Sequence, residues 1–221
     1  MEKVGKPLSS DTCINFTYRA KAIAHDLHIR GPHFKGTIPT NKCSSAIGQN
    51  ENHIVWLCKE CSKGTITHEL IHALGFHHEH TRLDRDHYVA VHKSYIMKDY
   101  MYNFQKVRQY DNDTTNLNIY HDLELPYDLK SIMHYEMKAF AKSSRNPTIT
   151  MISEKSGKDE GKGKILGQRI KTSSLDVYRI CKRYNCRKCA GEKVSTYEGQ
   201  GEGFLRTTSS LGVLLIQHIK R

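Results

Sequence analysis

The chain has 221 residues and a formal net charge of +11, and apolar residues make up 38% of it. That length suits one full-sized domain, and that apolar content excludes wholesale disorder. No stretch reaches the roughly 18 consecutive apolar residues of a membrane helix, so we expect no integral membrane segment. The first thirteen residues lack the apolar core of a signal peptide.

Seven cysteines are spread along the chain, and four of them form two Cys-x-x-Cys pairs, Cys58 with Cys61 and Cys186 with Cys189. Two such pairs can hold a structural zinc ion, but they normally lie about 15–20 residues apart. Here most of the chain separates them, so a disulfide framework is the better interpretation. Because seven is an odd number, at least one thiol stays free or pairs elsewhere.

Residues 53–57 (HIVWL) have the β-branched and aromatic character of a strand. The segment that follows, residues 65–86, reads TITHELIHALGFHHEHTRLDRD and contains the pattern H-E-x-x-H-x-x-G-x-x-H. From the composition of the chain, the expected number of chance matches is on the order of 10⁻⁴. The pattern occupies His68, Glu69, His72, Gly75 and His78.

The spacing of these residues explains their chemistry. Residues four apart share a helix face, so His68 and His72 can point at one metal ion. Glu69 can reach a water at that ion without being a ligand. Gly75 stands where the helix must stop, because glycine tolerates a left-handed turn, and that turn lets His78 approach the same ion. Three neutral imidazoles with an open fourth position are typical of a catalytic zinc site.

Each residue by itself has a simpler interpretation, as a surface or core histidine, a solvated carboxylate or an ordinary helix stop. Those interpretations would have to coincide at five positions, so the metal site is favoured. Three further histidines have no place in the pattern, and we interpret them as bystanders: His77, His80 and His87.

Beyond the generic pattern, residues 75–89 (GFHHEHTRLDRDHYV) resemble the signature of the astacin family of zinc endopeptidases. Residues 127–140 (YDLKSIMHYEMKAF) resemble the Met-turn of that family, and residues 165–169 (ILGQR) its GQR segment. The resemblance covers residues 10–187. It implies an α+β, metzincin-like fold, in which a twisted mixed sheet and a long zinc-binding helix lie above the cleft and an irregular lower subdomain ends in a helix.

The resemblance also implies roles for individual residues. One Zn²⁺ per chain would be bound by three histidines, His68, His72 and His78. Glu69 would act as the general acid–base. Tyr135 would stabilise the reacting oxyanion and is a possible additional zinc ligand.

Three more positions take their expected roles from the family. Met133 would lie beneath the metal, and Glu79 normally meets the amino terminus of the activated enzyme. Arg169 would line the pocket beyond the scissile bond and favour acidic substrate side chains, with a plain surface arginine as the equal alternative. Glu136 stands where the family usually has glycine, so the backbone there is expected to differ.

The expected disulfides follow from the same resemblance: Cys13 with Cys186, and Cys43 with Cys61 or Cys58. We expect residues 1–9 to be a residual N-terminal segment of a domain whose first strand and helix are absent. Residues 10–189 would form the peptidase domain, with an N-terminal subdomain to about residue 78 and a C-terminal subdomain after it. Residues 190–221 match nothing in the family and are expected to form a disordered tail.

The sequence therefore predicts a secreted metalloendopeptidase, a hydrolase acting on proteins or peptides. One alternative is a catalytically impaired or truncated astacin-like protein that acts as a secreted binding module. Another is a basic, zinc-dependent nucleic-acid binder. Residues 142–193 do hold fourteen Lys or Arg against five Asp or Glu, but few aromatic residues accompany them, so we expect no nucleic-acid partner. The oligomeric state stays open.

Overall fold

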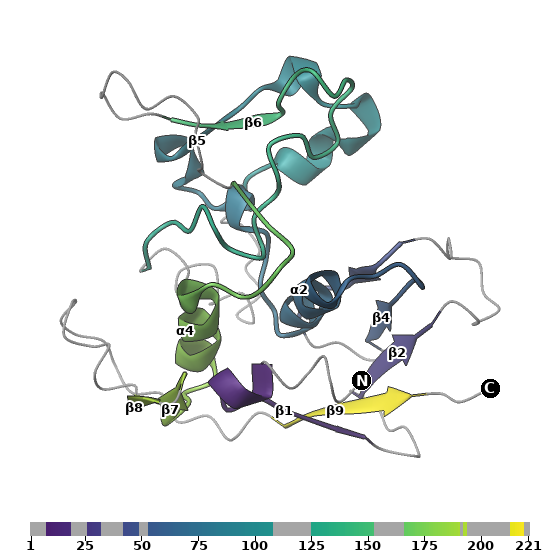
Figure 1. The fold of residues 1–221 in the computed structure, drawn as a ribbon, viewed down its shortest axis with the longest axis vertical. Helices are drawn as coiled ribbons and strands as arrows, with labels where there is room; N and C mark the ends of the chain where they lie inside the picture. Colours follow the sequence, from purple (N-terminus) through teal and green to yellow (C-terminus); the bar gives the residue numbers. More distant parts are fainter. Residues whose placement is uncertain are drawn as a thin grey trace. The chain divides into compact units, whose positions relative to one another are not determined.

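The computed structural model of the chain describes residues 8–18, 26–31, 42–48, 53–107, 125–152, 166–190, 192–193 and 213–218. The chain divides into two compact units. Unit 1 comprises Met1–Phe76 and Arg169–Arg221, and unit 2 comprises His77–Gln168. Strands and helices occur together along the chain (Figure 1), so the α+β prediction is confirmed.

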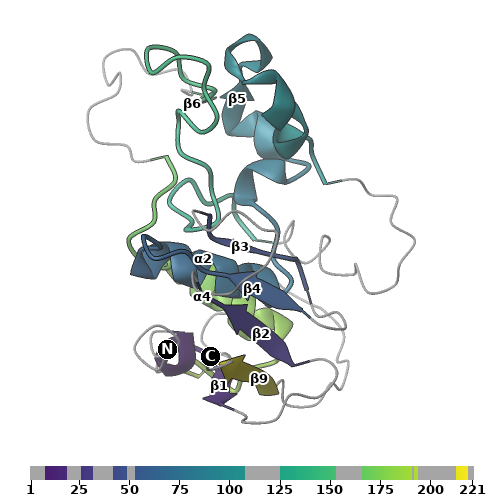
Figure 2. The ribbon, with the colours of Figure 1, turned by 90° about the vertical axis from the view of Figure 1, so that its right-hand side faces the viewer.

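Unit 1 contains a mixed five-stranded sheet (Figure 2), built from β1 Asn15–Tyr18, β2 Leu27–Arg30, β3 Ser44–Ser45, β4 Ile54–Trp56 and β9 Val213–His218. Its strand order is β1-β9-β2-β4-β3. The pairs β1–β9, β9–β2 and β2–β4 are parallel, and the edge strand β3 is antiparallel to β4. The strand predicted within residues 53–57 is confirmed as β4.

The C-terminal segment contributes strands to unit 1. β9 lies between β1 and β2, and β8 Glu192–Lys193 pairs with β7 Lys188–Cys189 in a small antiparallel sheet. Residues 191, 194–212 and 219–221 lie outside the described residues, as do residues 1–7 of the expected N-terminal segment. For these tail residues the expected disorder stays a prediction, whereas Glu192–Lys193 and Val213–His218 form strands.

Two α-helices of unit 1 each begin after a serine that acts as the N-cap. The helix α2, Lys63–Ala73, starts after Ser62, whose hydroxyl accepts a hydrogen bond from the N–H of Thr65. The helix α4, Ser174–Arg183, starts after Ser173, which exchanges hydrogen bonds with Asp176 in a capping box. α2 contacts β3 and β4 of the sheet, and α4 contacts β7.

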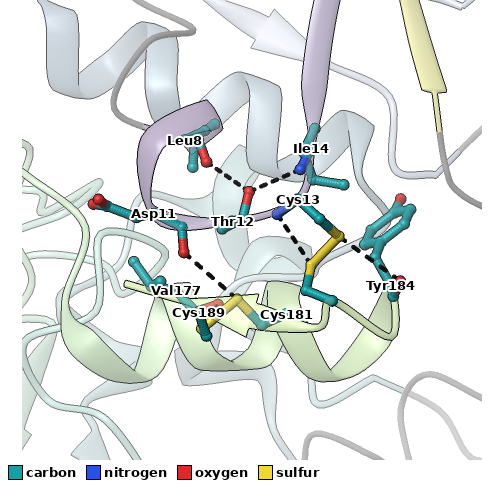
Figure 3. The surroundings of a disulfide bond; sticks show 10 residues. Leu8, Asp11, Thr12, Cys13, Ile14, Val177, Cys181, Tyr184 and Cys189 are labelled. Carbon is teal, nitrogen blue, oxygen red and sulfur yellow. Dashed lines mark hydrogen bonds between the residues drawn. A yellow bond between two sulfur atoms is a disulfide. The ribbon is translucent and has the colours of Figure 1, made fainter. Parts of the chain in front are cut away.

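One disulfide ties the segment before β1 to the residues that follow α4, and another ties α4 to β7 (Figure 3). Cys13 is bonded to Cys186, and a second bridge joins Cys181 to Cys189. A backbone hydrogen bond from Ala190 to Asp11 lies beside them at 2.7 Å. A third bridge joins Cys43 to Cys61. The first and third are pairings that the family resemblance implies, whereas the bridge from Cys181 was not expected.

Unit 2 is built mainly from turns and short 3-10 helices around a small core. Its elements are η1 Glu79–Thr81, η2 Arg85–His87, β5 Val89–Val91, η3 Lys93–Tyr95, η4 Lys98–Phe104 and β6 Ile149–Met151. β5 and β6 pair in an antiparallel ribbon. The ribbon contributes Val89 and Ile149 to a core that consists of Val89, Ile96, Phe104, Tyr127, Ile149 and Leu166. No helix among the described residues is long and apolar enough to cross a membrane.

Candidate metal centre

The helix α2 presents three of the predicted site residues from one buried stretch. His68, Glu69 and His72 are each at most 6% exposed. The imidazole rings of His68 and His72 lie one helical turn apart, with their centroids separated by 4.6 Å. The predicted i, i+4 arrangement of two histidines on one helix is therefore present.

The turn after α2 leads to the third histidine. Gly75 has a φ of +91°, a left-handed conformation that side-chain-bearing residues rarely adopt, and its N–H donates to the carbonyl of His72 at 2.8 Å. A Cβ at this position would also lie 2.6 Å from the guanidinium of Arg183. The prediction that the helix ends at this glycine is confirmed. Three residues further on, His78 brings its ring to the pair on α2.

One candidate ligand atom from each of His68, His72 and His78 lies within 4.8 Å of the others. Nδ1 of His72 lies 2.7 Å from the carbonyl oxygen of Phe76. A carbonyl can only accept, so this bond puts the proton on Nδ1 and leaves the lone pair of Nε2 for a metal. Three imidazoles of this kind form a donor set that Zn²⁺ prefers, and the residues therefore fit the predicted ion.

Glu69 combines burial with two groups that favour its charged form. Desolvation raises the pKa of its carboxyl to about 7. The guanidinium of Arg169 and a backbone hydrogen bond from Ser45 act in the opposite direction. A carboxyl with a pKa near neutrality can both accept and release a proton at physiological pH.

The backbone of Arg169 lies close to the first turn of α2, and Gly64 makes room for it because glycine has no side chain. A Cβ on Gly64 would overlap the carbonyl oxygen of Arg169. The GQR segment can approach the first turn of α2 closely only because residue 64 is glycine. This approach brings the cation of Arg169 within electrostatic range of Glu69.

In unit 2, the ring of Tyr135 stacks on that of His80 and is tilted against that of His78. Its ring centroid lies 4.6 Å from that of His78 and 3.9 Å from that of His80, with an angle of 24° between the planes of the latter pair. His80 is fully buried, and its Nε2 lies 3.0 Å from the carbonyl oxygen of Asn103. The ring of His80, which was expected to be a bystander, therefore packs on that of Tyr135.

A second glycine, Gly167, lies against the backbone of Tyr135. Gly167 has a φ of +66°, and a Cβ there would lie 2.6 Å from the carbonyl oxygen of Tyr135. Nδ1 of His134 hydrogen-bonds the same carbonyl at 2.6 Å, and the other ring nitrogen pairs with the hydroxyl of Tyr127. Stacking and close backbone approach leave no periodic signal, so the sequence could not reveal these supports.

Met133 and Glu79 meet through their backbones in unit 2. Met133 is 3% exposed, and its carbonyl accepts the N–H of Glu79 at 3.0 Å. The carboxylate of Glu79 accepts the N–H of Asp128 at 2.8 Å and forms an ion pair with Arg82 at 3.3 Å. The buried carboxylate of Glu79 therefore connects the segment after His78 to the start of the Met-turn segment at Asp128 by a hydrogen bond. The position of Met133 beneath a metal stays a prediction.

Comparisons with known proteins agree with this geometry. The sequence model of the peptidase family Astacin matches residues 2–185. The chain is 36% identical to zinc metalloproteinase nas-4 of Caenorhabditis elegans over 182 residues, which are 81% of this chain and 50% of that protein. It is 37% identical to the low choriolytic enzyme of Oryzias latipes over 184 residues, which are 82% of this chain and 58% of that enzyme. The chain thus spans less than two thirds of both relatives.

Among solved structures, the fold is similar to that of high choriolytic enzyme 1, a hatching enzyme zinc-protease from Oryzias latipes. The TM-score is 0.66 at 33% sequence identity, over 84% of this chain and 81% of that one. The resemblance that rests on the zinc-helix pattern and the Met-turn is confirmed, and the chain belongs to the astacin family.

Proposed function

We propose that the chain is a zinc-dependent endopeptidase that hydrolyses peptide bonds in proteins or peptides. The observation that carries this proposal is the group of three imidazoles on and after α2, whose candidate ligand atoms lie within 4.8 Å of one another. The adjacent carboxyl, Glu69, has the burial and the near-neutral pKa of a proton-transfer group. Membership in the astacin family supports the same activity.

In this proposal His68, His72 and His78 hold one Zn²⁺ ion. Bound there, zinc would acidify a water and polarise the scissile carbonyl. Glu69 takes the proton of the attacking water and passes it to the leaving amine. The hydroxyl of Tyr135 donates a hydrogen bond to the developing oxyanion, and the same residue is a possible fourth protein ligand before substrate binds.

Other residues of the proposal support this chemistry without taking part in it. Met133 forms an apolar layer under the histidines, and Glu79 holds the chain between His78 and the Met-turn. Arg169 is a substrate-pocket cation that selects acidic side chains. We place the protein outside the cell, because three disulfides persist best in an oxidising compartment.

Replacing Glu69 tests the proposal. Glu69→Ala should bind one zinc per chain, because no ligand is lost, but should cleave peptides at least about 100-fold more slowly, because the proton acceptor is gone. Zinc content and the cleavage of a peptide library, each with and without a chelator, are the measurements. Glu60→Ala, at an exposed glutamate before α2, is the matched control and should cleave like the wild type.

Two outcomes would contradict the proposal. Unchanged cleavage by Glu69→Ala would remove the glutamate from its role. A wild-type protein that binds zinc and cleaves no peptide in the library would favour the alternative, an astacin-like binding module.

A further inference from the structure

Three half-buried cysteines meet in unit 1, and the proposed hydrolysis uses none of them. Cys43 and Cys61 form a disulfide, and Cys58 is a free thiol. Sγ of Cys58 lies 3.1 Å from Sγ of Cys61 and 3.4 Å from Sγ of Cys43. The backbone N–H of Cys58 also donates to Sγ of Cys61 at 2.9 Å. The free thiol is therefore in contact with both sulfur atoms of the bridge.

The bridge joins two segments that border the candidate metal centre. Cys43 directly precedes the edge strand β3, and Cys61 directly precedes the N-cap of α2. The segment that begins with β3 contacts α2 at two points. The backbone of Ser45 donates to the carboxyl of Glu69, and the N–H of Gly48 donates to the carbonyl of His72 at 2.9 Å.

Each possible pairing would hold this segment differently. The bridge from Cys43 to Cys61 ties β3 to the start of the helix that carries Glu69. A bridge from Cys43 to Cys58 would tie β3 to the segment that follows β4. A bridge from Cys58 to Cys61 would close the short Cys-x-x-Cys loop and leave β3 held by its hydrogen bonds alone.

We propose that Cys43, Cys58 and Cys61 form a thiol–disulfide exchange site, in which the bridge moves among the three sulfurs and sets how β3 is held beside Glu69. Two observations support this. All three side chains are half-buried and so reach solvent, and the attacking sulfur already touches both of its targets. The consequence for peptide cleavage rests on the proposed function, whereas the exchange itself does not.

The exchange consumes no oxidant or reductant. The thiol of Cys58 loses its proton to solvent, and the thiolate attacks Sγ of Cys61. The bond from Cys58 to Cys61 forms as the bond from Cys43 to Cys61 breaks, and Cys43 leaves as a thiolate that takes up a proton. Attack on Cys43 instead forms the bond from Cys43 to Cys58 and frees Cys61. One disulfide and one thiol are present before and after.

Mapping the free thiol tests the proposal on the full zinc-loaded chain. The protein is equilibrated at mildly alkaline pH without added thiol or disulfide and quenched in acid, which stops exchange by removing thiolate. The free thiols are then alkylated, and the labelled peptides are identified by mass spectrometry. Three sulfurs of similar burial should share the free thiol about equally, so we expect Cys43 and Cys61 together to carry at least about half of the label. Label found on Cys58 alone overturns the proposal.

Variants at the same site sharpen the test. Cys58→Ser removes the attacking sulfur, so its bridge should stay fixed and neither remaining cysteine should take label. Label at Cys43 or Cys61 in this variant would overturn the proposal, because it would need no attack by Cys58. The disulfide between Cys13 and Cys186 is a matched internal control. The free thiol of Cys58 contacts the bridge from Cys43 to Cys61 and not this one, so neither Cys13 nor Cys186 should take label.

Cleavage assays then separate the two proposals. The wild-type rate should change by about twofold after this equilibration, because about half of the molecules would then hold β3 by a different bridge. The Cys58→Ser rate should stay constant. If neither protein cleaves peptide, the proposed function fails, and the label distribution still decides whether the exchange occurs. A redistributed label with an unchanged wild-type rate would overturn the link to β3.

Discussion

The two units position their candidate site residues by different means. In unit 1, α2 carries His68, Glu69 and His72 on regular backbone, with a serine cap at one end and a glycine turn at the other. In unit 2, Tyr135 lies among short 3-10 helices and turns, where few repeating hydrogen bonds hold the chain. In unit 2, side-chain contacts must therefore hold the site residues in position, as the helix does in unit 1.

Buried arginines perform much of that task. Arg82 pairs with both carboxylate oxygens of Asp84, at 2.8 and 2.9 Å, with Glu79, and with the carbonyl of Leu125. Arg85 donates to the carbonyls of His80 and Phe104. A guanidinium has five donors in a rigid plane, so one arginine can hydrogen-bond several chain segments that belong to no sheet.

The two units differ in which residues they can lose. Regular backbone distributes its stability over many hydrogen bonds, so a single substitution on α2 removes little. An irregular loop concentrates its stability in a few polar side chains. We therefore expect the largest losses of stability in unit 2, at residues that never touch a substrate.

Arg82→Ala should have the largest effect. It leaves the buried carboxylate of Glu79 without its ion-pair partner, and breaking a buried pair in this way costs about 3–5 kcal/mol. Chemical denaturation of the zinc-loaded protein measures the change in the free energy of unfolding. Arg145→Ala, at an exposed arginine of the same unit, should change it by less than about 0.5 kcal/mol. Equal losses in the two variants would show that the stability of unit 2 is not concentrated in its buried arginines.

Gly64→Ala tests a point in unit 1 where regular structure depends on a single residue. Alanine in a helix is normally favourable, but here its Cβ would overlap backbone at Arg169, so we expect a loss of about 1–3 kcal/mol. Gly31→Ala is the matched control, because its Cβ would meet nothing within 4 Å. A gain of stability in Gly64→Ala would show that the GQR segment does not approach the helix this closely.

The same difference explains what the sequence could predict. The strand within residues 53–57 and the helix ending before Gly75 follow from local patterns, and both are confirmed. The insertion of β9 between β1 and β2 depends on contacts across most of the chain, for which there is no local signal. The bridge from Cys181 to Cys189 was missed because the family resemblance accounted for four cysteines only.

The site shows the same limit. His68, Glu69, His72 and His78 are recognisable because helical spacing and the glycine turn that follows constrain them to fixed positions in the sequence. His80 follows two residues later and resembles any other histidine in a histidine-rich segment. Its stacking on Tyr135 joins residues 55 positions apart, and only the folded chain brings their rings together.

His80→Leu tests whether that stacking matters for the proposed reaction. If the ring holds Tyr135 in place for the oxyanion, kcat should fall about tenfold with little change in KM, because the interaction would be made in the transition state. Loss of zinc must be excluded by metal analysis. His87→Ala, at an exposed histidine of the same segment, should leave both constants unchanged.

A double-mutant cycle separates positioning from general stability. In a Tyr135→Phe background the phenolic hydroxyl is absent, so His80→Leu should lower kcat by a clearly smaller factor than in the wild type. The same factor in both backgrounds would mean that His80 acts independently of Tyr135 and only supports the loop.

Arg169→Glu should have the smallest effect, and it tests substrate choice rather than stability. Arg169 is half-exposed, so solvent screens its attraction for an acidic substrate side chain, and an ion pair of this kind contributes about 0.2–1 kcal/mol. The ratio of kcat/KM for an acidic peptide to that for its neutral amide analogue should therefore fall by up to about fivefold. Using a ratio matters because Arg169 also lowers the pKa of Glu69, and its loss would slow both peptides alike. Lys171→Glu, at an exposed cation two residues away, removes the same net charge and should leave the ratio unchanged. Equal shifts in both variants would assign the preference to the overall basic charge of the chain instead of to a pocket at Arg169.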